Sequence, residues 1–210
     1  MSFDIQSMYR FVVAAAALLA PLSGWAQSSS GAPEPPKVAR GIVTAIDNGL
    51  LTLKSTDGKT QTLMLAQHWS VSLLKPVAVE TIQPGSFIGT AEMPLANGSG
   101  RSLEVHVFPP GVKAGEGHFD WDLRKGSKMT NGTVGKVTAG AQGRELQVEY
   151  PGGQRHVVVP QNVPVVQITN GDRSQVKPGV PVFVMMTTGP TGQLTATGIA
   201  VSADGTKPPM

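Results

Sequence analysis

The sequence contains no cysteine among its 210 residues. This absence excludes structural disulfides, thiolate metal sites, cysteine nucleophiles and a lipoprotein anchor. Charged residues make up only 15% of the chain, and the basic ones are scattered singly apart from Arg124 and Lys125. Because a nucleic-acid-binding protein needs a basic patch or stripe, we expect no nucleic-acid partner.

Long hydrophobic runs are also scarce. The longest is 11-FVVAAAALLA-20, which follows Arg10 and precedes small residues typical of a cleavage site. It is too short to cross the roughly 30 Å of a bilayer core as a helix, so it predicts a signal peptide over residues 1–26 that starts at Met1 or at Met8. An uncleaved membrane tether is the alternative. We expect a periplasmic or secreted protein with no membrane span after cleavage.

Glycine and proline, in contrast, are abundant, with 25 and 17 copies. They punctuate turns and indicate many short elements. Residues 27–38 are polar and Pro-rich, which predicts a disordered leader. Apolar and polar residues then alternate over 41-GIVTAI-46 and 51-LTLKS-55 on either side of Asn48-Gly49. Since Asn-Gly is the strongest short signal for a hairpin, these segments are predicted strands.

The second half of the chain repeats this pattern. Residues 132-GTVGKV-137 match 41-GIVTAI-46, and 176-VKPG-179 matches 82-IQPG-85. Each unit holds about five or six short strands, which suits a small barrel that leaves few exposed edges. We therefore predict an all-β fold of two tandem small OB-like β-barrels. The predicted divisions are a first barrel over 39–108, an inter-domain joint over 109–131, a second barrel over 132–204 and a C-terminal tail over 205–210.

The joint carries the most distinctive residues, 115-GEGHFDWDL-123 followed by 128-KMTNGTV-134. Together with the barrel frame over 39–210, this motif resembles an exported bacterial family of unknown function with tandem OB-like barrels. Members of this family are often labelled metal ABC transporter permeases. A permease needs several membrane spans, which this sequence does not contain after the predicted signal peptide. The resemblance implies no catalytic residues.

Alternation along an extended segment would place the side chains of the joint on two faces. Phe119 and Trp121 would share an apolar face and form a clasp that wedges between the barrels, because each ring can bury a large area. The polar face would meet water or accept backbone N–H bonds. That face consists of Glu116, His118, Asp120 and Asp122.

The same polar face is the alternative functional interpretation, a divalent-metal site. One imidazole with several carboxylates suits Zn²⁺ or Mn²⁺. The segment alone supplies too few fixed ligands, so His106 and Glu104 from the preceding strand would have to join it. A second, soft-metal cluster of Met64, His68 and Trp69 could hold Cu(I), although the favoured explanation is a core methionine and a His-Trp pair at a strand end.

No phosphate-binding loop, nucleophile elbow or zinc-protease motif occurs in the sequence. Three classes of function remain. We expect a non-catalytic binding or scaffolding protein without a cofactor, whose partner is an envelope protein, peptide or glycan. A metal-handling accessory protein and an uncharacterised enzyme are the alternatives.

Overall fold

The computed structural model describes residues 36–189 and 191–210, and these fold almost entirely as strands. The predicted all-β barrel class is confirmed. The predicted signal peptide and residues 27–35 of the leader lie outside the described residues. In the described part of the chain, no helix has the length and hydrophobicity needed to span a membrane.

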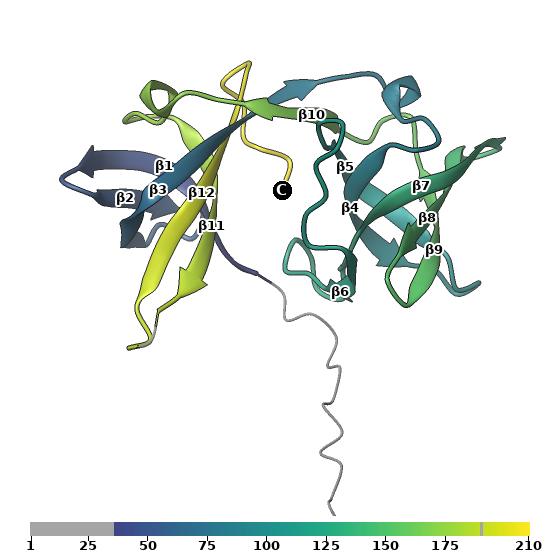
Figure 1. Ribbon diagram of the computed structural model, residues 1–210, viewed down its shortest axis with the longest axis horizontal. Helices are drawn as coiled ribbons and strands as arrows, with labels where there is room; N and C mark the ends of the chain where they lie inside the picture. The colour runs from purple at the N-terminus through teal and green to yellow at the C-terminus, as the bar shows by residue number, and fades with distance from the viewer. Residues whose placement is uncertain (1–35, 190) are drawn as a thin grey trace, which may run out of the picture. The chain divides into compact units, whose positions relative to one another are not determined.

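Twelve strands and two short 3₁₀ helices follow one another along the described chain (Figure 1). The elements of the first half are β1 (Lys37–Asp47), β2 (Leu50–Ser55), β3 (Thr60–Pro76), η1 (Val79–Thr81), β4 (Phe87–Pro94), β5 (Gly100–Val107) and β6 (Gly117–Asp120). Those of the second half are β7 (Lys128–Gly140), β8 (Gly143–Tyr150), β9 (Gly153–Val159), β10 (Val165–Asn170), η2 (Arg173–Gln175), β11 (Pro181–Thr188) and β12 (Leu194–Ser202).

The hairpin between β1 and β2 forms at the predicted Asn48-Gly49 turn. Both residues adopt positive φ, 48° and 76°, as the tight turn between two twisted strands requires. Gly58 and Gly152 also adopt positive φ in the turns that precede β3 and β9. Local turn chemistry therefore sets the two antiparallel meanders β1–β2–β3 and β7–β8–β9.

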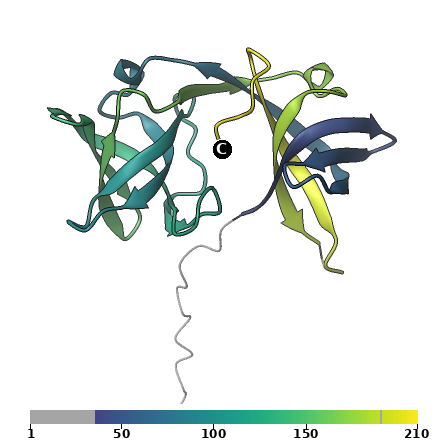
Figure 2. The ribbon, with the colours of Figure 1, turned by 180° about the vertical axis from the view of Figure 1, so that it is seen from behind.

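Each meander is closed into a barrel by two strands from the other half of the chain. The first barrel has the circuit β1–β2–β3–β12–β11, in which β3 and β12 run parallel. The second barrel has the circuit β7–β8–β9–β5–β4, in which β5 and β9 run parallel. In Figures 1 and 2 the yellow β11 and β12 therefore stand beside the purple and blue β1, β2 and β3.

This strand exchange differs from the predicted division into a barrel over 39–108 and a barrel over 132–204. The reason is the length of β3. Its 17 residues span roughly 55 Å at the usual rise of a strand, which is more than a small barrel accommodates. Residues 72–76 pair with β10, and Lys75 and Pro76 extend beyond the pairing with β12 of the first barrel. The chain has thus left the first barrel before β4 begins. The alternation of apolar and polar residues is irregular after residue 65, so the sequence pattern does not mark this continuation.

The two halves nevertheless make matching hydrogen bonds. The Gly85 N–H donates to the carbonyl of Val134, and the Gly179 N–H donates to the carbonyl of Val43, so in each half the donor is the glycine of the Pro-Gly turn. Pro84 and Pro178 are separated by the same number of residues as Leu74 and Ile168. Leu74 and Ile168 pair with each other across β3 and β10. A residue of one barrel and a residue of the other are therefore treated as corresponding when they have equivalent places in the strand pairing of their barrels.

Each barrel encloses its own apolar core. Val43, Leu53 and Ile199 are buried in the first barrel, and Val134 and Val105 are buried in the second. Two smaller clusters lie outside the barrels. One joins β3, β10, β11 and β12, and includes Met210, so part of the predicted tail is buried. The other joins β4, β6 and β7.

The exchange predicts that neither half of the chain folds alone as a monomeric barrel. Separate fragments 36–113 and 114–210 each supply three strands of one barrel and two of the other, so each monomer leaves open edges and half-covered cores. When mixed, they should form a one-to-one complex with the β-sheet circular dichroism and cooperative melting of the intact chain. Light scattering measures the stoichiometry. A monomeric fragment that melts cooperatively would contradict the exchange.

Candidate functional site

The motif that stands out in the sequence lies on the second barrel. Its β6 pairs antiparallel with the first residues of β7, with His118 opposite Thr130 and Phe119 opposite Met129. Residues 128–131, predicted to belong to the joint, therefore start a barrel strand. Phe119 is buried, whereas Asp120 is exposed, as expected for alternating faces.

Trp121 connects the two outer apolar clusters. Its ring packs edge-on against Phe119 at 6.3 Å between centroids and lies 6.4 Å from Phe183 of β11. The guanidinium of Arg40 sits 5.7 Å from the centroid of the Trp121 ring and 5.2 Å from that of Phe183. Arg40 also binds both carboxylate oxygens of Asp122 at 2.8 Å. These contacts link strands of both barrels.

Each carboxylate of the joint forms an ion pair with a nearby basic side chain. Asp120 is bound by Lys128, Asp122 by Arg40, and Glu116 lies 3.8 Å from Lys113. The polar face therefore binds side chains rather than backbone N–H groups. Within the described residues, no three histidine or acidic side chains come together as a metal site would require. The predicted ligands for Zn²⁺ or Mn²⁺ are thus distributed over separate pairs.

One of these pairs is buried. Glu104 Oε2 lies 2.7 Å from His106 Nε2, and both side chains are almost wholly shielded from water. His106 Nε2 also lies 3.0 Å from the carbonyl of Pro209. Burial disfavours the imidazolium, but the Glu104 carboxylate outweighs it and raises the pKa of His106. The pair therefore fixes the 209–210 segment against β5.

The predicted soft-metal cluster does not have the arrangement that Cu(I) would need. Met64 is 53% exposed and His68 is exposed on the surface of β3. The ring of Trp69 is covered by Arg173, whose guanidinium lies 4.6 Å from the ring centroid. Arg173 also donates to the carbonyl of Trp69 at 2.6 Å, so this tryptophan face already stacks on a cation.

A buried polar cluster that the sequence did not reveal lies at one end of the second barrel. Glu92 of β4 is fully buried, and its Oε1 accepts a hydrogen bond of 2.5 Å from Arg155 Nε. Arg155 donates further to the carbonyls of Gly98 and Ser99. Among the described residues, Glu92 Oε2 has no hydrogen-bond partner. Burial raises the pKa of Glu92, whereas Arg155 acts to lower it.

Hydroxyl groups complete this cluster. Thr90 Oγ1 lies 2.8 Å from Ser102 Oγ and donates to the carbonyl of Glu104 at 2.7 Å. Thr130 is fully buried beside them, opposite Thr90 in the register of β4 and β7. The end of the second barrel is therefore built from side chains that need hydrogen bonds or counter-charges once they leave water.

His118 of β6 covers this polar end. Its Nδ1 lies 2.8 Å from Thr130 Oγ1 and 3.9 Å from Glu92 Oε1, and its ring stacks with Tyr150 at 6.3 Å between centroids. Burial and the positive charges of Arg155 and Lys128 lower the pKa of His118. The neutral imidazole thus closes the end of the barrel, which shows that the polar face of the joint contributes to the structure.

The corresponding end of the first barrel is apolar. The pair Val184 and Ala39 of the first barrel takes the place of the pair Thr90 and Thr130 of the second. In the same way, the pair Met186 and Ala196 takes the place of the pair Glu92 and Ser102. A register shift falls just before Met186 and just before Glu92. Gln61, opposite Leu53, takes the place of Arg155, opposite Val148. One fold therefore carries an ionic end and an apolar end.

The apolar end is open and holds a hollow of about 610 Å³. Met186 and Leu194 of the first barrel line it, together with Trp121 of the joint. The remaining lining residues are Pro36, Lys37, Val38, Gln61, Asp120 and Asp122. The hollow thus combines aliphatic and aromatic walls with a charged rim.

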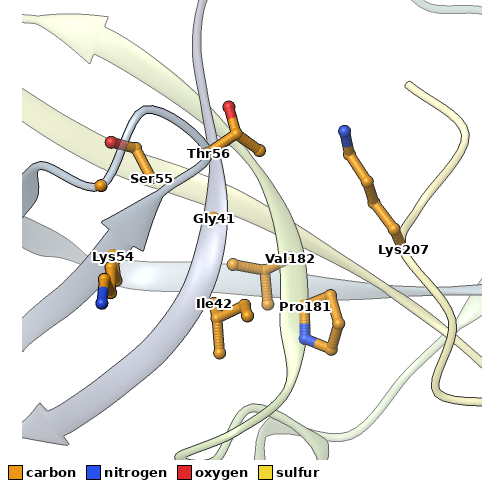
Figure 3. A pocket seen from close by; sticks show the side chains of 9 residues that line it. Gly41, Ile42, Lys54, Ser55, Thr56, Pro181, Val182 and Lys207 are labelled. Carbon is orange, nitrogen blue, oxygen red and sulfur yellow. The ribbon is translucent and has the colours of Figure 1, made fainter.

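A second hollow, of about 410 Å³, lies on the outer surface of the first barrel (Figure 3). Ile42, Pro181 and Val182 lie close together at its centre in the close-up, and Lys54 and Lys207 lie to either side. Ile42 is 48% exposed there. This surface has no contribution from the joint, which makes it a suitable control site.

Comparisons with protein family models, with curated proteins and with solved structures found no match to this chain. The resemblance of the joint to an exported bacterial family therefore stays a prediction. The functional interpretation depends on the geometry of the two barrel ends.

The ion pair in the second barrel should respond to pH when it is broken. Replacing Arg155 by Met leaves Glu92 buried without its counter-charge, which should lower the free energy of unfolding at pH 7 by about 3–5 kcal/mol. Because the pKa of Glu92 is raised in the folded state, the carboxyl takes up a proton as the pH falls, and the deficit should shrink towards pH 5. Urea unfolding at both pH values measures it.

The matched control introduces into the second barrel the residue types found at the corresponding positions of the first. The double variant Glu92→Met/Arg155→Gln installs the counterparts Met186 and Gln61, and it should recover most of the lost stability at pH 7. A deficit that does not change with pH, or a double variant as unstable as Arg155→Met, would contradict this account of the cluster.

The clasp predicts a loss of stability when its tryptophan is removed. Trp121→Ala deletes the ring between Phe119 and Phe183, and since Trp121 is only partly buried the cost should be about 3 kcal/mol, at the lower end of core tryptophan truncations. Thermal unfolding measures the loss. Val112→Ala, at an exposed loop position, is the control and should melt like the wild type. Equal melting of Trp121→Ala and wild type would disprove the clasp.

Proposed function

We propose that the protein is a non-catalytic, exported binding protein that takes up an apolar segment of an envelope partner at the open end of its first barrel. The observation that carries this proposal is the hollow lined by Met186, Leu194 and Trp121. Its size and its apolar walls with a few polar groups at the rim are typical of ligand sites. The predicted signal peptide and the resemblance to an exported family support an envelope location.

The contrast between the two barrel ends supports binding rather than catalysis. At the ionic end, Glu92 and Arg155 bind each other and His118 covers them, so these groups are directed at one another. At the apolar end, Ala39 and Met186 stand at the places of Thr130 and Glu92, and such apolar side chains gain free energy by leaving water. Aliphatic walls also favour apolar peptide side chains over a glycan, since a sugar needs many hydrogen-bonding groups.

Dye binding tests the proposed function. The uncharged apolar fluorophore Nile red should bind the folded protein with enhanced fluorescence. Leu194→Lys places an ammonium in the hollow and should weaken this binding about tenfold, because an apolar ligand would then have to desolvate a charge. The matched control is Ile42→Lys, which alters the second hollow (Figure 3).

The control should keep the affinity of the wild type, and circular dichroism should show both variants folded. If Leu194→Lys binds the dye as well as the wild type does, or if Ile42→Lys removes the binding, the hollow at the barrel end is not the binding site.

A further inference from the structure

The start of β1 has a strand on only one side. Over Lys37–Arg40 it pairs with β11, whereas its pairing with β2 begins at Gly41. The corresponding start of β7 is flanked on both sides, because Lys128–Asn131 pairs with β4 on one side and with β6 on the other. Among the described residues, no strand occupies the place on the first barrel that β6 occupies on the second.

The backbone groups at this open edge can be assigned from the register. Val43 exchanges hydrogen bonds with the turn that leads into β11, through Val180 and Gly179. Since successive residues of a strand direct their N–H and C=O groups to opposite sides, Val38 and Arg40 direct theirs away from β11. Two donors and two acceptors therefore lie along the open edge.

The second barrel shows what such an edge accepts. Val134 bonds to the turn before β4, so the same alternation directs the backbone groups of Met129 and Asn131 towards β6. Trp121 N–H donates to the carbonyl of Ser127, which continues this pattern by one more pair. A four-residue extended segment is thus seated on the edge that corresponds to Lys37–Arg40.

The hollow lies beside the open edge. Lys37 and Val38 line it, together with Gln61, Met186 and Leu194. The last three correspond to residues of the second barrel that surround the place covered by β6, namely Arg155, Glu92 and Gly100. The hollow therefore occupies the position that His118 covers in the second barrel.

We propose that the Lys37–Arg40 edge binds an extended peptide segment of a partner protein as an added antiparallel strand, with an aliphatic side chain at the place of His118 entering the hollow. This inference rests on the proposed function and specifies its ligand class. Added strands obtain affinity from backbone hydrogen bonds and specificity from pockets for alternate side chains.

The aliphatic preference follows from the lining. His118 on the second barrel faces the hydroxyl of Thr130 and the carboxylate of Glu92. The counterparts on the first barrel are Ala39 and Met186, which offer an imidazole no partner. An aliphatic side chain gains free energy by leaving water there, whereas an unpaired polar group would lose its hydration without compensation.

The edge is also suited to a short peptide rather than to open-ended sheet growth. It has four residues and is preceded by Pro36, which has no N–H to continue a ladder. Lysine and proline are residues that natural proteins place at edges to prevent aggregation, and Lys37 and Pro36 stand at this one. A peptide of about the length of β6 therefore fills it.

The probe is a synthetic peptide that copies residues 116–121 with leucine at the place of His118, acetylated and amidated at its ends. We expect it to bind the folded full chain saturably, to shift the backbone amide resonances of Val38 and Arg40, and to slow the hydrogen exchange of both amides. The matched peptide that keeps histidine should bind at least tenfold more weakly.

Methylation of the peptide backbone separates strand addition from simple burial of a side chain. An N-methyl group at the place of Phe119 removes the donor that faces Val38 and should lower the affinity at least tenfold. An N-methyl group at the leucine is the control, because this N–H points away from β1, and it should preserve binding.

The outcomes distinguish the two proposals. If both methylated peptides bind equally well, or if no peptide shifts the amides of Val38 and Arg40 while the dye still depends on Leu194, strand addition is wrong and the apolar site stands. If neither peptide nor dye binds at this end, both proposals fall.

Discussion

The antiparallel pairing of β3 with β10 is the contact on which the rest of the fold depends. It brings residues 72–76 against residues 166–170, with Leu74 opposite Ile168. After β3 the chain passes through η1 to β4 of the second barrel, and after β10 it passes through η2 to β11 of the first barrel. Because β3 and β10 each carry the chain from one barrel to the other, β4 and β5 close the second barrel and β11 and β12 close the first. Both cores therefore contain side chains from both halves of the chain.

Within this frame, the two barrel ends have different chemistry at matching positions. A buried ion pair generally gives less stability than well-packed apolar side chains of the same volume, because desolvation opposes the Coulombic attraction. Met186 and Ala196 show that the fold accepts the apolar solution, yet Glu92 and Ser102 stand at the corresponding places. The ionic end also fixes β6 through His118, and β6 carries the residues that lead to Trp121. The polar cluster therefore positions the joint that forms one wall of the hollow.

Much of the local structure could be predicted from the sequence, because it depends on turn chemistry. Asn48-Gly49 and the Pro-Gly turns at Pro84 and Pro178 fix hairpins and strand entries through backbone conformation alone. The exchange could not be predicted, since a local pattern specifies which residues form strands but not which distant strand they pair with. For the site, the alternation over 116–123 predicted the face that carries Phe119 and Trp121. The partners of that face, Arg40 and Phe183, lie far away in the chain.

Glu92 and Arg155 were missed for a related reason. A single acid or base in a strand is usually exposed, and only the comparison of Glu92 with Met186 at the matching place of the other half indicates a buried position. The same comparison revealed the open edge. Among the described strands, none on the first barrel corresponds to β6, and a local sequence pattern cannot show that such a strand is missing.

The parallel contact between β3 and β12 has a consequence for the order in which the molecule can form. Val71 pairs with Ile199, so the first barrel, although it begins with β1, is closed by β12, the last of the described strands. Contacts between residues so distant in sequence slow folding, because the long loop must close before any of the contacts is gained. A ribosome or a translocation channel that releases this chain from its N-terminus would release β1, β2 and β3 long before β11 and β12, which complete their barrel. The topology itself thus prevents the first barrel from closing until β11 and β12 are free.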